Sequence, residues 1–179
     1  MKKVASIFVV LVAAMFSFPP IAQAELNAKN VEQEVLKVVK KYASSVSCGA
    51  EGFTVFAIES FINVEPYVSE WYEYGVIWAD NLACQGGKIS HFYLSTVTAS
   101  SGLFGSRVLV DSTFPPVRLP IYDFEKIVSA TPDTIVIHGL VRGENDTHAS
   151  GPRQKVAITL KFIRDGKTGW TPVKIENRK

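Results

Sequence analysis

The sequence of 179 residues has few of the residues, and none of the common motifs, from which enzymes build active sites. Its three histidines, His91, His138 and His148, are far apart, and its two cysteines lack C-x-x-C spacing. The G-x-S-x-G pentad of α/β-hydrolases, the zinc motif H-E-x-x-H, the P-loop and the G-x-G-x-x-G loop are all missing from it. These absences predict a non-catalytic protein that has no cofactor and no metal site.

The chain also has no net charge after its first 24 residues. The sequence contains 19 Lys and Arg and 17 Asp and Glu, and the first 24 residues hold two of the bases and none of the acids. Residues 25–179 therefore carry 17 charges of each sign. A neutral domain has no general electrostatic attraction to nucleic acid or to an anionic membrane surface. We therefore predict no nucleic-acid partner.

The first 24 residues have the pattern of a cleaved export signal. Lys2 and Lys3 precede an apolar run from Val4 to Phe18, and residues 22–24 read Ala-Gln-Ala, a small-residue cleavage site. The run is too short to remain as a membrane-spanning helix, so no span is expected after its removal. The Met-Lys-Lys start is typical of bacterial signals. We expect a mature single domain over residues 25–179, located in the periplasm or secreted.

The two cysteines, Cys48 and Cys84, are expected to form a disulfide because exported proteins fold in an oxidising environment. The bond would close a loop of about 37 residues, for which loop entropy gives an upper value of roughly 4 kcal/mol. A metal site or a redox thiol is the alternative. Both need nearby ligands or a paired spacing that this sequence does not have.

One amphipathic helix is predicted near the start of the mature chain. Asn30 can cap it, with Gln33 three residues later, and the helix is expected to end between Ser44 and Gly49. Apolar residues recur at helical spacing and are expected to share one buried face. They are Val31, Val35, Val38, Tyr42 and Val46.

The remainder of the chain is predicted to form strands. They are Phe53 to Val64, Tyr74 to Trp78, Ile89 to Ala99, Arg107 to Asp111, Thr134 to Val141, Lys155 to Ile163 and Gly169 to Ile175. The first has apolar residues on both faces, which favours a central strand over the alternative of a helix. Pro172 makes the last strand an edge strand or the site of a bulge. Phe114 to Pro120 contains three prolines and is expected to be a stiff, extended loop.

A helix followed by an antiparallel sheet of about five to seven strands defines an α+β class. This order of elements resembles the outline of cystatin-like and NTF2-like domains. The resemblance implies a curved sheet that wraps the N-terminal helix, and it assigns no catalytic residue. Domains of this outline serve as inhibitors, binding modules and enzymes, so the outline does not choose among these functions.

Three groups of polar residues are candidates for chemistry. They are Glu144, Asp146 and His148; His91 and His138; and Asp80, Asn81 and the run from Cys84 to Gly87. A carboxylate beside an imidazole can share a metal or form a base with its orienting partner. Each group also has a structural explanation, as a hydrated loop, as histidines on a half-buried sheet face, or as a tight turn. The structural explanation is the simpler one in all three cases.

Aromatic residues give the best indication of a binding surface. Five of them fall within twelve residues: Tyr67, Trp71, Tyr72, Tyr74 and Trp78. The last two are expected in the core, whereas Tyr67, Trp71 and Tyr72 are predicted to lie in a connection and to form an exposed patch. Flat aromatic rings are frequent in protein interfaces because they bury a large area at little entropic cost.

We therefore expect a small exported binding domain whose partner is another envelope or extracellular protein. One alternative is a periplasmic small-ligand binder, which requires an apolar cavity between helix and sheet. Another is a hydrolase, which requires one of the histidines to lie within hydrogen-bond distance of a carboxylate.

Overall fold

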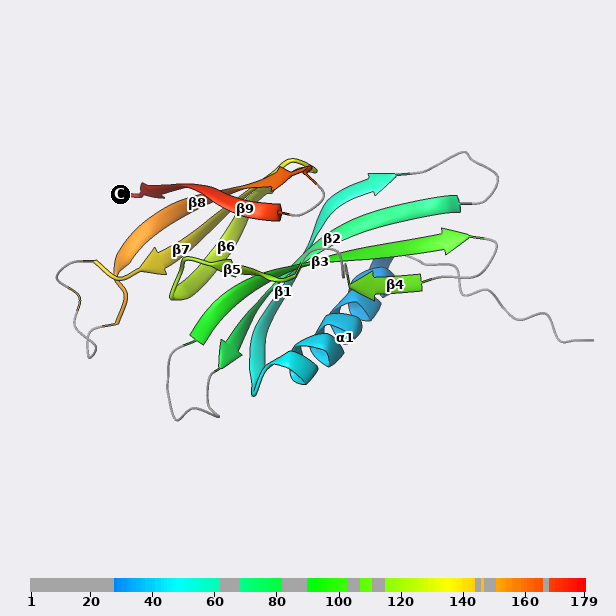
Figure 1. Ribbon diagram of the computed structural model, residues 1–179, viewed down its shortest axis with the longest axis horizontal. Helices are drawn as coiled ribbons and strands as arrows, with labels where there is room; N and C mark the ends of the chain where they lie inside the picture. The colour runs from blue at the N-terminus through cyan, green and yellow to red at the C-terminus, as the bar shows by residue number, and fades with distance from the viewer. Residues whose placement is uncertain are drawn as a thin grey trace, which may run out of the picture.

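Three layers make up the protein: one helix, a first sheet and a second sheet (Figure 1). The computed structural model describes residues 28–61, 68–81, 90–102, 107–110, 115–143, 146, 151–165 and 168–179. The predicted α+β class is confirmed. The second sheet departs from the predicted arrangement of one helix on one sheet.

The described elements are one helix and nine strands. They are α1 (Ala28–Val46), β1 (Ala50–Phe61), β2 (Val68–Asn81), β3 (Ser90–Gly102), β4 (Arg107–Val110), β5 (Val117–Leu119), β6 (Asp123–Ala130), β7 (Thr134–Val141), β8 (Gln154–Ile163) and β9 (Gly169–Asn177). Sheet A has the order β1-β2-β3-β4, and β5 pairs with the first part of β3. Sheet B has the order β6-β7-β8-β9, and every pairing is antiparallel.

Helix α1 packs on sheet A through residues spaced four apart. Val31, Val35, Val39 and Ala43 are fully buried, whereas Val46 is 56% exposed. The predicted face was therefore right at its start and displaced by one position further along. Asn30 lies in the first turn rather than before it. An α-helix has 3.6 residues per turn, so residues spaced four apart move slowly around the helix axis. Residues next to this stripe are therefore partly buried as well.

Sheet A is buried on both faces at its centre. Tyr74, Val76 and Trp78 face α1, while the alternate residues Ile77 and Leu94 face sheet B. Across that second interface, sheet B contributes a set of fully buried residues, Ile135, Ile137, Ile158 and Leu160. The apolar residues on both faces of β2 and β3 follow from this double cover.

The segment predicted as a central strand, Phe53 to Val64, instead overlaps β1 (Ala50–Phe61), an edge strand of sheet A. Its residues are apolar on both faces because α1 contacts one face and β6 of sheet B approaches the other. Burial on two faces is therefore possible at an edge. The pattern of apolar residues correctly predicted that both faces of this strand are covered. It incorrectly predicted that the strand lies at the centre of the sheet.

Strand β6 was not predicted, because two bulges break its alternation. Register shifts fall between Phe124 and Lys126 and between Ile127 and Ser129. As a result, the residues that pack against the inter-sheet core are Phe124, Ile127 and Ala130, three positions apart. A spacing of three resembles a helical period more than the period of two that identifies a strand.

The strand edges differ in how they are protected from further pairing. The loop predicted for Phe114 to Pro120 contains the short edge strand β5, which lies between Pro116 and Pro120. Pro172 is confirmed as a residue of an edge strand, and a register shift lies beside it in β9. Strands β1 and β6 also carry register shifts, and β4 shows neither a shift nor a proline. Bulges and prolines discourage the addition of another strand.

Several strands match their predicted ranges closely. Strand β7 spans the predicted residues, β4 and β8 differ from prediction by one residue, and the inward residues of β8 are the predicted alternate set. Across the described residues, no helix has the length and apolar character that a membrane-spanning segment requires.

Candidate functional site

The predicted aromatic patch is divided by the structure. Trp71 and Tyr72 lie in β2 rather than in a connection, and neighbouring residues of a strand point to opposite faces. Tyr72 packs with the helix-facing cluster, and its ring centroid is 6.5 Å from that of Tyr74. Tyr67 lies outside the described residues. Trp71 is therefore the member of the trio that faces away from α1 and remains exposed, at 38%.

One end of sheet A extends beyond sheet B, because β2 and β3 are longer than the strands that cover them (Figure 1). The register pairs Trp71 with Ser100, and Ser100 in turn with Arg107 on the next strand. In the same way it pairs Glu73 with Thr98, and Thr98 with Leu109. The face of this end that points away from α1 is named the ledge. It consists of Trp71, Glu73, Thr98, Ser100, Arg107 and Leu109.

The ledge combines apolar and charged side chains on a flat surface. Leu109 is 60% exposed, and Arg107 is exposed at the end of the same strand. The neighbouring residues Val108 and Val110 point the other way and pack against the helix-facing cluster. Leu109 and Arg107 were not singled out from the sequence, although the alternation within Arg107–Val110 does indicate two exposed positions.

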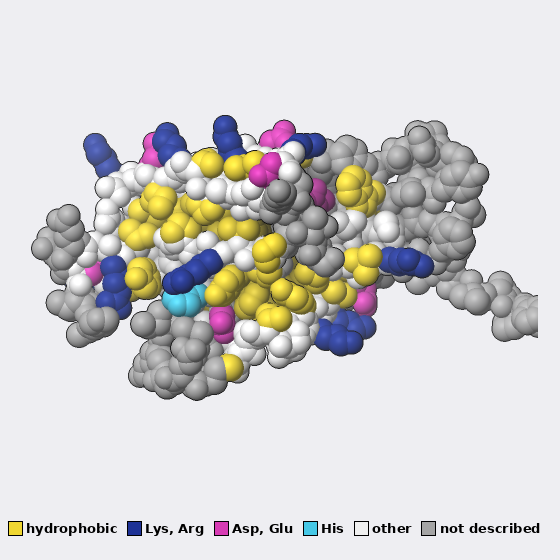
Figure 2. Space-filling view, viewed as in Figure 1, with side chains coloured by type: hydrophobic (Ala, Val, Ile, Leu, Met, Phe, Trp, Pro, Cys, Tyr) yellow, Lys and Arg dark blue, Asp and Glu magenta, His cyan; other side chains and the backbone are white. Residues whose placement is uncertain are grey.

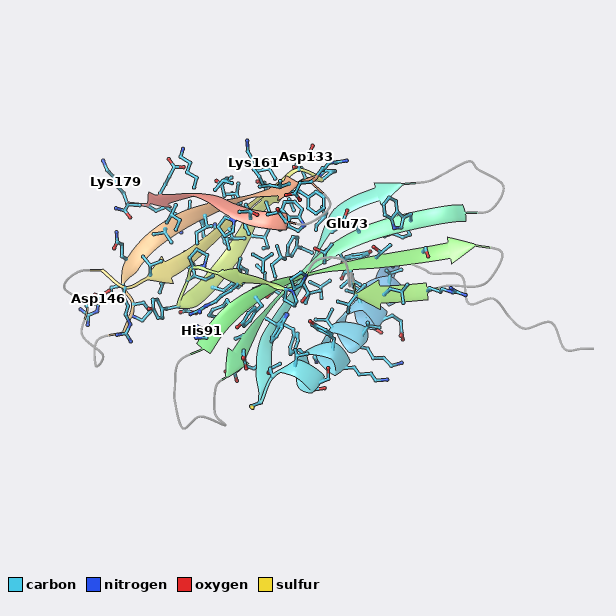
Figure 3. The ribbon with its side chains drawn as sticks, in the orientation of Figure 1. Glu73, His91, Asp133, Asp146, Lys161 and Lys179 are labelled. Atoms are coloured by element: carbon cyan, nitrogen blue, oxygen red, sulfur yellow. The ribbon has the colours of Figure 1, made fainter. Side chains whose placement is uncertain are left out.

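His91 lies at the opposite end of sheet A, where β3 begins (Figure 3). It stands directly across from Asp80 on β2, yet its hydrogen-bond partner is Arg118 of β5. Arg118 Nη2 is 2.9 Å from His91 Nδ1 and 3.3 Å from Nε2. Asp80 Oδ1 is buried and has no hydrogen-bond partner in the described part of the chain. The structure therefore brings together two candidates from different predicted groups, without forming an Asp–His dyad.

His138 lies on the outer face of sheet B, in the row that joins Lys126 to Ala157. Its Nδ1 atom is buried with no hydrogen-bond partner among the described residues. Burial lowers the pKa of His138, the nearby positive charges of Arg178 and Lys126 lower it further, and Glu125 opposes them. This environment favours the neutral imidazole, and no described residue forms a hydrogen bond with its Nδ1 atom.

An ion pair crosses the same face. Arg178 Nη1 donates to Glu125 Oε2 at 2.7 Å, which links the end of β9 to β6. This hydrogen bond lowers the pKa of Glu125. The pair connects the two edge strands of sheet B over its middle strands, so its role here is structural.

Asp146 has a structural role in its loop. Its Oδ2 atom accepts hydrogen bonds from the backbone N–H groups of Gly143, at 2.8 Å, and Arg153, at 3.0 Å. These bonds lower its pKa, because they stabilise the charged carboxylate. The other predicted members of this group, Glu144 and His148, lie outside the described residues.

Cys48 follows α1 directly, at the start of the chain that enters β1. Its predicted partner Cys84 lies outside the described residues, as does the run to Gly87, so the disulfide stays a prediction. The register pairs Ala50 with Asp80, which sets the strand entered after Cys48 beside the strand that leads toward Cys84. No described cysteine is a free thiol.

Within the described ranges, no three His, Cys, Asp or Glu residues come together in an arrangement that could hold a metal ion. Comparisons with protein-family models, with curated proteins and with solved structures found no match to this chain. Functional inference therefore rests on the ledge and on the surroundings of His91.

Proposed function

We propose that this chain is an exported, non-catalytic binding domain whose partner is another protein of the cell envelope or the extracellular space. The ledge is the proposed contact surface. The observation that carries this proposal is that Trp71 and Leu109 are exposed on the same face as Arg107, with β3 between Trp71 and the other two, on a part of sheet A that sheet B leaves uncovered.

The composition of the ledge favours a protein as the partner. Aromatic residues and arginine are enriched in protein interfaces, and tryptophan and arginine contribute many of their hot spots. The ledge is the exposed face of three paired strands, which suits a broad partner better than a small molecule. The expected partner presents an apolar side chain to Trp71 and Leu109 and a carboxylate to Arg107, since these groups complement one another.

Export and the disulfide belong to the same proposal. The signal-like pattern of residues 1–24 supports export to the periplasm or beyond, with the mature sequence starting at Glu25. The adjacency of the β1 start and the β2 end supports a Cys48–Cys84 bond. Helix α1 with sheet A is the part that would correspond to the cystatin-like or NTF2-like outline.

The two alternatives receive less support. A ligand cavity between helix and sheet competes with the direct packing of α1 on the fully buried residues Val76 and Val97. A hydrolase requires a histidine paired with a carboxylate. The described histidines instead meet Arg118, in the case of His91, or have an unpartnered Nδ1, in the case of His138.

The test is site-specific crosslinking followed by affinity measurement. A photo-reactive amino acid at position 109, in cells that export the protein, should crosslink one partner that the same group at position 122 does not capture. With that partner purified, Trp71→Ala should weaken binding about 30-fold, corresponding to a hot spot of roughly 2 kcal/mol. Tyr122→Ala is the matched control, because Tyr122 is a similarly exposed aromatic residue, at 44%, away from the ledge. Equal crosslinking at both positions, or an unchanged affinity for Trp71→Ala, would overturn the proposal.

A further inference from the structure

A pocket of about 350 Å³ lies at the end of sheet A opposite the ledge. It is lined by His91, Arg118, Leu119, Pro120, Ile121 and Tyr122. We propose that this pocket binds a small organic monocarboxylate with an apolar body. The site is distinct from the ledge and independent of the proposed protein partner.

The lining provides an apolar surface of fixed shape. Leu119 and Ile121 are 2% and 4% exposed and belong to the inter-sheet core, so they cannot move away from a ligand without disturbing that core. Pro120 between them restricts the backbone. The volume is near the lower end of the range for small-molecule pockets, roughly 300–1,000 Å³, which limits the ligand to a small ring or a short chain.

Arg118 supplies a positive charge that the described residues do not neutralise. Its guanidinium donates to His91, and no described carboxylate forms an ion pair with it. Since arginine can only donate, the His91 nitrogen that accepts must carry no proton. Four further N–H groups of the guanidinium, in a planar fork, suit a carboxylate. Figure 2 shows a histidine beside a basic side chain on this face, bordered by apolar side chains.

A second guanidinium lies near the pocket. Arg142 is positioned over the ring of Tyr122, 5.2 Å from the ring centroid. Tyr122 is therefore held in the pocket wall with a cation on one side. Arg142 also acts on the Asp146 carboxylate, so Arg118 is the main attraction for a negative ligand beside Tyr122.

Asp80 limits the negative charge that a ligand can carry. It also offers His91 a new hydrogen-bond partner when a ligand binds Arg118. Asp80 stands directly across from His91 on the adjacent strand, and its buried Oδ1 atom has no partner in the described residues. When a ligand carboxylate takes Arg118, the His91 ring is released and can turn to donate to Asp80. An unsatisfied buried acceptor is then satisfied, which favours binding. A dianion such as phosphate would be repelled more strongly by Asp80, so a monoanion is preferred.

The experiment is an NMR titration of the ¹⁵N-labelled mature protein with sodium benzoate, benzamide and sodium sulfate. Benzoate should produce saturable shifts that centre on His91 and on residues 118–122, with a dissociation constant in the millimolar range, as expected for so small a ligand. Benzamide, which has the same shape without the charge, should bind at least about tenfold more weakly, the effect of one charge-assisted contact. Sulfate, which lacks the apolar body, should also bind more weakly.

Arg118→Gln should weaken benzoate binding about tenfold or more, while Arg107→Gln, a matched change on the ledge, should leave it unchanged. Tyr122→Ala is a second variant on an exposed side chain and should weaken benzoate binding by a few-fold, since it removes apolar contact and the ring over which Arg142 lies. Trp71→Ala should retain benzoate binding, which separates this proposal from the protein partner.

Three results would overturn the carboxylate site. They are equal affinity for benzamide, equal affinity for sulfate, and unchanged benzoate affinity in a folded Arg118→Gln protein. Absence of saturable shifts up to about 50 mM benzoate would overturn it as well, because an affinity weaker than that gives no specific site.

Discussion

The two ends of sheet A are built from the same strands and differ in what covers them. At one end, Ile77 on β2 and Leu94 on β3 are buried under sheet B, at 0% and 2% exposed. At the other end, Trp71 lies on the same face of β2, six residues earlier, and is 38% exposed. Strand alternation therefore assigns a face to each residue, but only the neighbouring layer decides whether that face becomes core or contact surface.

The largest expected effect comes from comparing Ile77→Ala with Trp71→Ala. Ile77→Ala should lower the free energy of unfolding by about 2–5 kcal/mol, because it leaves a cavity between the two sheets. Trp71→Ala removes a larger side chain but should cost less than about 1 kcal/mol, as substitutions on a surface do. Urea denaturation of both variants measures the difference. Equal losses would show that the two ends do not differ as described.

The next effect concerns the proposed disulfide, which would fasten only the end that contains Asp80 and His91. Cys84→Ser should reduce the free energy of unfolding by about 2–4 kcal/mol, the usual range for a native disulfide. The reduced wild-type protein should be destabilised by a similar amount, and reduction should not affect Cys84→Ser further. Rapid labelling of both cysteines in the native, non-reduced protein would contradict the bond.

The smallest expected effect concerns His138 in sheet B, the sheet that covers one end of sheet A, and the pH dependence of the free energy of unfolding. Burial lowers the pKa of His138 in the folded state, so the unfolded chain takes up a proton first as the pH falls. The free energy of unfolding should therefore decrease as the pH drops below about 6.5, the ordinary pKa of histidine, and this contribution should vanish above it. His138→Gln should show a weaker decrease between pH 8 and pH 5 in urea denaturation. An identical decrease in both proteins would assign the effect to other groups.

The sequence was a good guide wherever a single layer of packing produced a simple period. The helix, β7 and β8 followed from spacings of about four and of two. Strand β6 did not, because its two bulges bring Phe124, Ile127 and Ala130 inward at a spacing of three. A period cannot reveal a strand whose inward residues are reset by bulges, and β6 was missed for this reason. The other strands of sheet B were predicted, but a period does not show which strands pair, so their separation into a second sheet was missed.

The candidate sites depended on relations that the sequence does not contain. Trp71 was identified from its neighbours in sequence, but Arg107 and Leu109, which share its face of the sheet, come from a strand two positions away, with β3 between them. Arg118 was passed over within a proline-rich stretch, since nothing in that stretch shows that it meets His91. Strand pairing between distant parts of the sequence brings such groups together. These pairings cannot be read from a single sequence that has no matching family.

Strand β4 has a consequence for how the molecule behaves when it is concentrated. Every other described edge strand is interrupted by a register shift or bordered by proline, whereas β4 offers a regular backbone edge with Leu109 projecting from one face. Strand addition between molecules meets the fewest backbone irregularities along this strand, and the four-residue length of β4 and the exposed Arg107 limit how far it extends. The four residues of β4 would then influence both the solubility of the protein and its packing in crystals.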